Sequence, residues 1–354
     1  MNNPRRKIKS RVFEAEVIPG LESFAIDELH DRFGAEASKV RRVRAGFIRF
    51  RFSEPAQLLL ALRSVIAVYQ VHHFVIPRPK ALLGHEHFAR LTKILNETAQ
   101  SFAEPPRTFG IGAAGARTSV MRRLHQALLD KLNLAPAEDG KGELFVRLQP
   151  KREAQGWELL IRISQRPLSA RAYRVVNMPG SLNATAAYAM TQLESLDNGA
   201  TVVNLCSGAS TILIEQALVQ PQHQLIAIDC SETALSAGAR NASASGIGHR
   251  ILHIQADAGQ SPLPSHSADR LYADLPFGHH VGSHETNRRL YPAILEEAER
   301  LARSRAPFII LTHEVKLLRR CLQQSSWAIS SEIRINLRGL HPRVFVLRRN
   351  STRI

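Results

Sequence analysis

Residues 274 to 278 read Asp-Leu-Pro-Phe-Gly and directly follow the apolar run Leu-Tyr-Ala. Proline and glycine commonly mark turns, so the stretch is typical of a strand that ends in a turn. A carboxylate beside an aromatic ring can also hold and orient a flat substrate. The stretch therefore predicts either an ordinary turn or a catalytic loop, and the residues around it decide between the two.

Three other predicted strands also end in small or polar residues. The first, at 201–205, leads into Cys-Ser-Gly-Ala-Ser-Thr, where small side chains let a ligand approach the backbone. The second ends at Asp229, 21 residues after Gly208, where an acid can accept hydrogen bonds from both hydroxyls of a ribose. The third ends at Asp257, in position to meet an adenine amino group. Ligands of open α/β sheets bind beyond these strand ends, so the set predicts an adenosine site.

The turn after the first of these strands also limits the choice of cofactor. It contains neither GxGxxG nor GxxxxGK[ST], the two motifs that cradle phosphates. An adenosine held without a phosphate cradle favours S-adenosylmethionine over NAD or ATP.

The elements that position these residues follow two different rhythms along the chain. From residue 200 onward, strands and helices alternate, which is typical of a doubly wound, Rossmann-like parallel α/β sheet. The stretch 327–348 predicts two further strands that form an antiparallel edge. Before this stretch we expect a ferredoxin-like α+β domain at 1–80, followed by a second region of mixed helices and strands. Their predicted helices span 21–33, 56–68, 86–100 and 115–131, and their predicted strands span 13–17, 47–52, 69–76, 107–112, 143–148 and 157–163.

Charge separates the two halves of the chain as well. The 354 residues carry a formal net charge of +16. Residues 1–180 hold 30 Lys and Arg against 17 Asp and Glu, a net charge of +13, whereas residues 181–354 hold 17 against 14, a net charge of +3. A strongly basic half predicts a polyanionic partner.

Cysteines and apolar stretches exclude several classes of protein. Cys206, Cys230 and Cys321 form neither a disulfide framework nor a CxxC pair, and no histidine stands at ligand spacing with them, so no metal is expected. The basic start lacks a following apolar segment, and Arg63 interrupts the most apolar stretch, so no membrane association is expected. The expected compartment is a reducing cytoplasm.

Longer stretches carry a resemblance to the THUMP-domain RNA methyltransferases, especially their tRNA guanine-N2 branch. These are "EAEVIPGLESFAIDEL", "DLPFG" with the following "GSHETNRRLYP", and "LTHEVKLL". "DLPFG" is similar to the family's variant of the (Asp/Asn)-Pro-Pro-aromatic loop, which methylates ring or exocyclic nitrogens. The resemblance covers nearly the whole chain and implies a THUMP domain at 81–175 and a methyltransferase domain at 176–354. It also implies a monomer that uses S-adenosylmethionine to methylate N2 of a tRNA guanine, in the acceptor stem.

The resemblance implies roles for individual residues. Asp274 and the carbonyl of Leu275 would accept hydrogen bonds from the guanine amino group, and Phe277 would stack on the flipped base. The implied catalytic residues are Asp274, Leu275, Pro276 and Phe277. The implied cofactor-binding residues are Ser181, Leu182, Asn183, Asn204, Gly208, Ser210, Thr211, Asp229, Cys230, Asp257, Ala258 and Asp274. The implied RNA-binding residues are Arg117, Arg122, Arg123, Arg166, Arg171, Arg174, His279 and His280.

Two departures from the family pattern bear on the cofactor site. Asn204 stands where relatives usually carry an acid, and Ser210 stands where they carry a glycine. The Cβ of Ser210 is expected to crowd the ligand or to forbid a positive φ, and both changes are expected to weaken cofactor binding. Three alternatives stay open: a non-catalytic tRNA-binding protein, a methyltransferase of ribosomal RNA, and a methyltransferase of another base nitrogen such as adenine N6.

Overall fold

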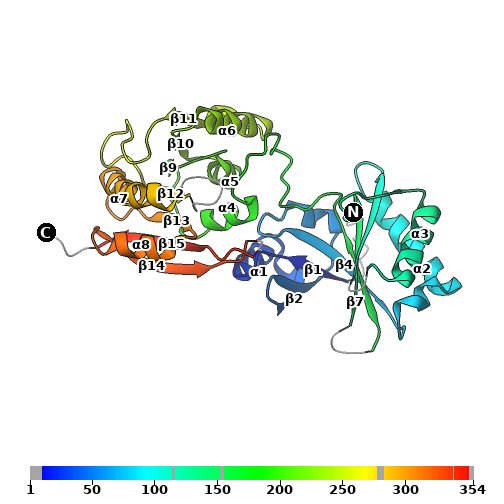
Figure 1. Cartoon of the computed structure of the whole chain (residues 1–354). Coiled ribbons are helices and arrows are strands. Elements are labelled where there is room, and N and C mark those ends of the chain that lie inside the picture. Colours follow the sequence, from blue (N-terminus) through cyan, green and yellow to red (C-terminus); the bar gives the residue numbers. More distant parts are fainter. Residues whose placement is uncertain (1–9, 114–115, 152–154, 277–282, 338, 351–354) are drawn as a thin grey trace, which may run out of the picture. The chain divides into compact units, whose positions relative to one another are not determined.

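A computed structural model describes residues 10–113, 116–151, 155–276, 283–337 and 339–350 of the chain (Figure 1). The chain forms two compact units. Unit 1 comprises Met1–Val17 and Ala25–Ser169, and unit 2 comprises Ile18–Phe24 and Ala170–Ile354. Most of the two domains expected at 1–80 and 81–175 therefore lies in unit 1, whereas residues 18–24 and 170–175 belong to unit 2.

The strands of unit 1 form a single sheet in the order β2-β3-β1-β4-β8-β7-β5-β6. Strand β4 pairs with β8 from Tyr69 opposite Arg162 to Phe74 opposite Trp157, so the sheet continues across the expected boundary at residue 80. Ending the sheet at β4 would leave its backbone N–H and C=O groups as an unpaired edge. The strands are β1 (Arg11–Glu16), β2 (Ala37–Arg44), β3 (Phe47–Phe52), β4 (Ala67–Phe74), β5 (Thr108–Ala113), β6 (Ala135–Pro136), β7 (Leu144–Pro150) and β8 (Trp157–Arg162).

Three of the four helices expected in this part of the chain are present, and the helix expected at 56–68 is not. Helices α1 (Glu22–Phe33), α2 (His85–Gln100) and α3 (Ser119–Leu132) are present. The helix expected at 56–68 is wrong: only a short 3₁₀ helix, Ala56–Ala61, forms, and β4 begins at Ala67. Strand β2 was not expected because most of its residues are exposed or only partly buried, so its sequence lacks an apolar alternation.

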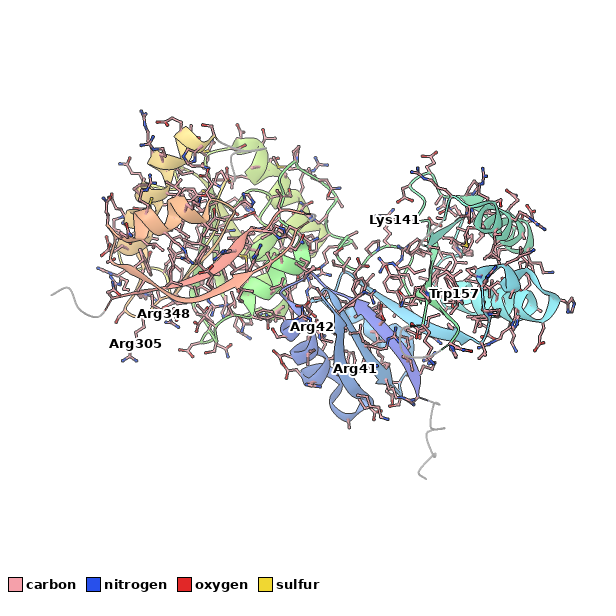
Figure 2. The ribbon with its side chains drawn as sticks, turned by 60° about the horizontal axis from the view of Figure 1, so that its bottom comes forward. Arg41, Arg42, Lys141, Trp157, Arg305 and Arg348 are labelled. Carbon is pink, nitrogen blue, oxygen red and sulfur yellow. The ribbon has the colours of Figure 1, made fainter. Side chains whose placement is uncertain are left out.

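Some arginines of this sheet form ion pairs with buried carboxylates and so do not contribute to the surface charge. The Glu14 carboxylate is fully buried and accepts hydrogen bonds from Arg44 Nη2 (3.0 Å) and Arg49 Nη2 (2.6 Å). The same Arg49 Nη2 also donates to Glu158 Oε2 at 2.8 Å. The exposed side chains of Arg41 and Arg42 project from β2 (Figure 2). Arginines of the basic half thus serve two purposes, internal pairing and surface charge.

Unit 2 contains the expected Rossmann-like sheet. Its strand order is β11-β10-β9-β12-β13-β15-β14, and the first five of these are mutually parallel. Strand β15 pairs antiparallel with both β13 and β14, which confirms the predicted antiparallel carboxyl-terminal edge. The strands are β9 (Thr201–Leu205), β10 (Gln224–Asp229), β11 (Ile251–Gln255), β12 (Arg270–Asp274), β13 (Phe308–Thr312), β14 (Trp327–Arg334) and β15 (Arg343–Arg349).

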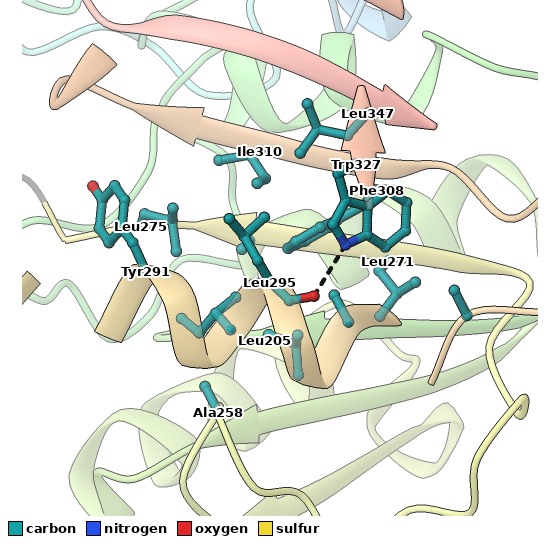
Figure 3. Packing of buried hydrophobic residues seen from close by; sticks show 14 of the residues in the cluster. Leu205, Ala258, Leu271, Leu275, Tyr291, Leu295, Phe308, Ile310, Trp327 and Leu347 are labelled. Carbon is teal, nitrogen blue, oxygen red and sulfur yellow. Dashed lines mark hydrogen bonds between the residues drawn. The ribbon is translucent and has the colours of Figure 1, made fainter. Parts of the chain in front are cut away.

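Helices α7 and α8 bury an apolar core against this sheet (Figure 3). Within that core the indole Nε1 of Trp327 donates a hydrogen bond to the carbonyl of Leu295 at 3.0 Å, which satisfies its one polar atom. Helix α4 packs against α5, and α6 packs against β10 and β11. In the described part of the chain, no helix is both long and apolar enough to cross a bilayer. The helices are α4 (Ala184–Thr191), α5 (Thr211–Val219), α6 (Glu232–Ala244), α7 (His284–Leu301) and α8 (Val315–Leu322).

Candidate active site

The carboxyl ends of four parallel strands meet at one edge of the unit 2 sheet. Leu205, the last residue of β9, pairs with Ile228 of β10 on one side and with Ala273 of β12 on the other. The residues that follow these three are Cys206, Asp229 and Asp274. The register alone therefore brings two of the predicted acids to either side of the turn after β9.

Electrostatics at Cys206 support the same arrangement. Burial raises the pKa of its thiol, and the negative charges of Asp229, Asp274 and Asp257 raise it further. Three predicted site acids thus act on a single sulfur atom. The strand ends form one cluster, as the sequence predicted.

The turn after β9 has an unusual backbone that accommodates Ser210. Cys206, Gly208 and Ser210 all have left-handed conformations, with φ of 58°, 53° and 57°. The expectation that Ser210 forbids a positive φ is therefore wrong. Its side chain is fully buried, and its Oγ lies 3.1 Å from Ser207 Oγ and 3.2 Å from His253 Nε2. Because burial lowers the pKa of His253, its neutral ring can accept a hydrogen bond from the Ser210 hydroxyl.

A glycine in helix α6 makes room for that serine. A Cβ on Gly238 would lie 2.4 Å from Ser210 Oγ and 3.1 Å from Ser210 Cβ. The hydroxymethyl group thus occupies space that an alanine at 238 would fill, beneath the turn and away from solvent. Ser210 does not present its side chain at the surface of the site.

Asn204 is also turned inward. It is 1% exposed within β9, and with its amide oriented for donation it reaches the carbonyls of Leu205 (3.2 Å) and Tyr272 (3.1 Å). The Asn204 side chain thus joins β9 to β12 and does not reach the surface of the site.

The Asp229 carboxylate is held in a fixed position from which it can accept hydrogen bonds from hydroxyl groups. Its Oδ2 accepts a hydrogen bond from Gly208 N at 2.7 Å, and its Oδ1 accepts one from Ser231 N at 3.0 Å. Each carboxylate oxygen retains a further lone pair for a hydroxyl donor. A Cβ on Gly208 would meet no atom within 4 Å, so the space beside the turn is open. A fixed acid beside an open, side-chain-free turn fits a ribose.

Asp274 is the most perturbed acid of the cluster. It keeps partial contact with solvent, but burial raises its pKa to about 7. Among the described residues, no donor forms a hydrogen bond with its carboxylate, so the burial is uncompensated. At physiological pH this carboxyl group is therefore present both as the charged carboxylate, which accepts hydrogen bonds, and as the neutral acid.

Residues that follow Asp274 are held from two sides. The Leu275 amide donates to the Leu311 carbonyl of β13 at 3.0 Å. The Pro276 carbonyl accepts hydrogen bonds from Asn287 Nδ2 (2.9 Å) and from the Tyr291 hydroxyl (3.1 Å). Sequence reasoning assigned no role to Asn287 or Tyr291, although their four-residue spacing puts them on one face of a helix, and both belong to the stretch "GSHETNRRLYP".

Comparison with known proteins identifies unit 2. Residues 171–343 match the family model described as UPF0020: RMKL-like, methyltransferase domain. The chain carries a methyltransferase domain of this family. The U6 snRNA (guanine-N(2))-methyltransferase THUMPD2 of Bos taurus is 31% identical over 172 residues, which are 49% of this chain and 32% of that protein. The tRNA (guanine(6)-N2)-methyltransferase of Methanocaldococcus jannaschii is 23% identical over 217 residues, 51% of this chain and 57% of that protein. The chain thus spans about a third to somewhat over half of these relatives' length.

Solved structures extend the similarity beyond the methyltransferase domain. TrmN from Thermus thermophilus is 25% identical, with a TM-score of 0.73 over 97% of this chain and 100% of that one. A possible methylase from Clostridium difficile 630, 14% identical, shares the fold with a TM-score of 0.69. The expected resemblance to the THUMP-associated guanine-N2 methyltransferases is confirmed.

The remaining predicted cofactor residues lie near the ends of elements of the methyltransferase domain. Asp257 is exposed and accepts a hydrogen bond from Gly259 N at 2.8 Å. Cys230 is exposed, Ala258 is buried in the core, and Thr211 is the first residue of α5. Asn183 caps α4 by accepting a hydrogen bond from Thr185 N at 2.8 Å. Leu182 is buried and Ser181 is partly exposed. Among the described residues, no hydrogen bond joins 181–183 to the strand ends, so their role stays a prediction.

The predicted RNA-binding residues fall into three groups. Arg117, Arg122, Arg123 and Arg166 are exposed and available to a polyanion. Arg171 is different: its side chain is 8% exposed and forms an ion pair with the buried Glu215 of α5 at 3.0 Å, so it supports the fold of the methyltransferase domain. Arg174 donates to the Leu182 carbonyl at 3.0 Å. Phe277, His279 and His280 lie outside the described residues.

Proposed function

We propose that the protein is an S-adenosylmethionine-dependent RNA methyltransferase that acts on N2 of a guanine, with tRNA as substrate. One observation carries the proposal. Asp274 is an acid with a pKa raised to about 7 by burial, at the same sheet edge as the ribose-accepting Asp229, in a domain of a methyltransferase family. The relatives are named as methyltransferases of guanine N2 in tRNA or U6 snRNA, which supports the choice of atom.

The chemistry asks for orientation more than for acid strength. When bound, S-adenosylmethionine supplies an electrophilic methyl group on a sulfonium. An exocyclic guanine amine is a weak nucleophile, so most of the rate must come from alignment. The Asp274 carboxylate would accept a hydrogen bond from the amine, aim its lone pair, and take up or relay the proton lost as the N–C bond forms. The Leu275 carbonyl and Phe277 would hold the flipped base beside it.

We also propose roles for the residues on the cofactor side of this site. Asp229 would hold the ribose hydroxyls, Asp257 with Ala258 would meet the adenine, and the turn 206–211 would face the methionine part. We assign Ser181, Leu182 and Asn183 to the opposite side of that part. Asn204 and Ser210 would act indirectly, by shaping the backbone.

The finer domain organisation belongs to this proposal as well. We infer a ferredoxin-like region at 1–80 and a THUMP domain at 81–175, both within the sheet of unit 1, followed by the methyltransferase domain at 176–354. Exposed arginines of α3 and Arg166 would bind RNA phosphates, which provide affinity with little sequence information. A cytoplasmic monomer is the simplest form of such an enzyme.

The non-catalytic alternative rested on two changes, the charge lost at Asn204 and the bulk added at Ser210. The buried position of Ser210 argues against the second, because its side chain is accommodated inside the domain without obstructing the turn. A titration calorimetry experiment with S-adenosylmethionine tests this directly. A folded protein that binds tRNA but no cofactor would restore the alternative.

Product analysis decides the substrate. Unmodified transcripts of tRNA, ribosomal RNA and U6 snRNA are incubated with methyl-labelled S-adenosylmethionine and then digested to nucleosides. We expect N2-methylguanosine from tRNA. Label in N6-methyladenosine, or in ribosomal RNA alone, would overturn the assignment.

A further inference from the structure

The residues after Asp274 are held by a closed ring of hydrogen bonds between α7, β13 and the start of α8. Asn287 Nδ2 donates to the Pro276 carbonyl (2.9 Å) and to Glu314 Oε1 (2.8 Å). The Tyr291 hydroxyl donates to the same carbonyl (3.1 Å) and lies 2.7 Å from Thr312 Oγ1. The Glu314 amide donates to Thr312 Oγ1 at 2.9 Å, which closes the ring.

Each side-chain N–H and O–H donor in this ring has its own acceptor. The Asn287 amide has two hydrogens, and each has its own acceptor. The single Tyr291 proton goes to the Pro276 carbonyl, so the Thr312 hydroxyl must donate to Tyr291 and accept from the Glu314 amide. The two lone pairs of the Pro276 carbonyl are then both used. The direction of that carbonyl is fixed by two donors from one helix face.

We propose that Asn287, Tyr291 and Glu314 are positioning residues for methyl transfer. They hold the Pro276 carbonyl, while the Leu275 amide is held by Leu311 at 3.0 Å. Asp274 immediately precedes the anchored Leu275 amide, and the Leu275 carbonyl immediately precedes Pro276. Fixing these two groups therefore also fixes Asp274 and the Leu275 carbonyl. Methyl transfer to a weak nucleophile depends on such alignment, and displacement of about 1 Å can cost roughly a hundredfold in rate. This inference rests on the proposed function.

Burial shows that the ring is not optimised for stability alone. Asn287 is fully buried, and within the described residues its Oδ1 has no donor. An unpaired buried amide oxygen destabilises the folded state, whereas a leucine there would avoid that cost. A leucine could not hold the Pro276 carbonyl. On the outer side, Glu314 Oε2 pairs with Nδ1 of the exposed His284 at 2.6 Å, which fixes the carboxylate that orients Asn287.

Kinetics of single and double variants test the proposal. Asn287→Ala and Tyr291→Phe should each lower kcat about tenfold to a hundredfold, with the KM for RNA and the Kd for S-adenosylmethionine within about twofold of wild type. The double variant should lose less than the product of the two single losses, because both side chains act on one carbonyl. Glu314→Gln keeps an acceptor for Asn287 and should retain most of the activity that Glu314→Ala loses. Arg288→Ala, on the exposed face of the same helix, is the matched control and should match wild type.

Hydrogen exchange provides a readout that needs no RNA. The Leu275 amide should exchange faster in Asn287→Ala and Tyr291→Phe, while β9 and β10 keep their protection. Unchanged kcat in the folded variants, or faster exchange spread evenly over the whole sheet, would overturn the proposal. A wild-type protein that methylates no RNA would contradict the proposed function instead, and the exchange pattern would still decide whether the ring anchors the loop.

Discussion

The turn after β9 and the loop after β12 lie side by side at the same sheet edge but are built in opposite ways. The turn 206–211 is held through its backbone and by packing: the Gly208 amide donates to Asp229, and Ser210 fills a space left by Gly238. The loop is held by a ring of side chains, in which Asn287 and Tyr291 donate to its Pro276 carbonyl and Glu314 orients Asn287. The first region needs space for a ligand, whereas the second needs a fixed direction. Each can therefore be broken by a different kind of change.

The largest effect is expected at the loop itself. Asp274→Asn keeps the shape of the side chain but removes the charged acceptor, so methyl transfer should fall about 10²- to 10⁴-fold, the range for removal of a general base. Binding of S-adenosylmethionine should be unchanged, because we assign the ribose contact to Asp229. Rates with labelled cofactor and tRNA give the answer, and Asp130→Asn on the exposed face of α3 is the control. An Asn variant with near wild-type kcat would remove Asp274 from the chemistry.

On the turn side, Asp229→Ala should act on affinity instead of rate. Hydrogen bonds to a charged group contribute about 1.5–3 kcal/mol, so the Kd for S-adenosylmethionine should rise about 10- to 100-fold. The amides of Gly208 and Ser231 also lose their acceptor. At saturating cofactor, kcat should recover most of its wild-type value. If kcat stays low at saturation, the two regions do not divide binding and chemistry as described.

A pH profile distinguishes the regions without mutation. The Asp274 pKa of about 7 means that its acceptor form disappears as the pH falls. Activity should therefore decline about tenfold per pH unit below 7 and level off above it, while cofactor binding stays flat. A sloping profile in Asp274→Asn would assign the titration to another group.

The same pKa makes a prediction for stability, with its sign set by linkage. Because the folded-state pKa of Asp274 lies above the unfolded value, the folded state binds more protons, and stability declines as the pH rises towards 7. Asp274→Asn should consequently raise the melting temperature at pH 8 and have little effect near pH 4. Equal effects at both pH values would show that burial does not raise the pKa of Asp274 in the folded state.

The two regions also differ in how far the sequence predicts them. Strand ends follow from apolar runs bounded by Gly and Asp, so Asp229, Asp257 and Asp274 were placed correctly at one sheet edge. The hydrogen-bonded ring could not be derived, because a helix pattern shows that Asn287 and Tyr291 share a face without showing what lies opposite. Ser210 was misjudged for a similar reason: the space left by Gly238 belongs to another helix.

Unit 1 shows the same limit at the level of the fold. Strands β1, β3 and β4 have apolar alternation and were predicted, whereas the exposed, basic β2 was not. Residues 56–68 show apolar residues at helical spacing, but from Ala67 the pairing of β4 with β1 and β8 overrides that local preference. Charge predicted a polyanion partner without revealing that Arg171 is committed to Glu215 inside the methyltransferase domain.

The smallest effect concerns the space beneath the turn, and it tests whether Ser210 and Gly238 form one unit. Replacing a helical glycine by alanine normally stabilises a helix by roughly 0.5–1 kcal/mol. Here the new Cβ would meet Ser210 Oγ at 2.4 Å, so Gly238→Ala should destabilise unit 2 by about 1–3 kcal/mol, the cost of overpacking a core. Ser210→Gly removes the clash and relieves the positive φ, so the double variant should be at least as stable as wild type. Denaturant unfolding measures all three variants, with Ser236→Ala on the exposed face of α6 as control. If the double variant were as unstable as Gly238→Ala, the serine would not be the group that requires a glycine at 238, and the turn would owe its shape to something other than this pair.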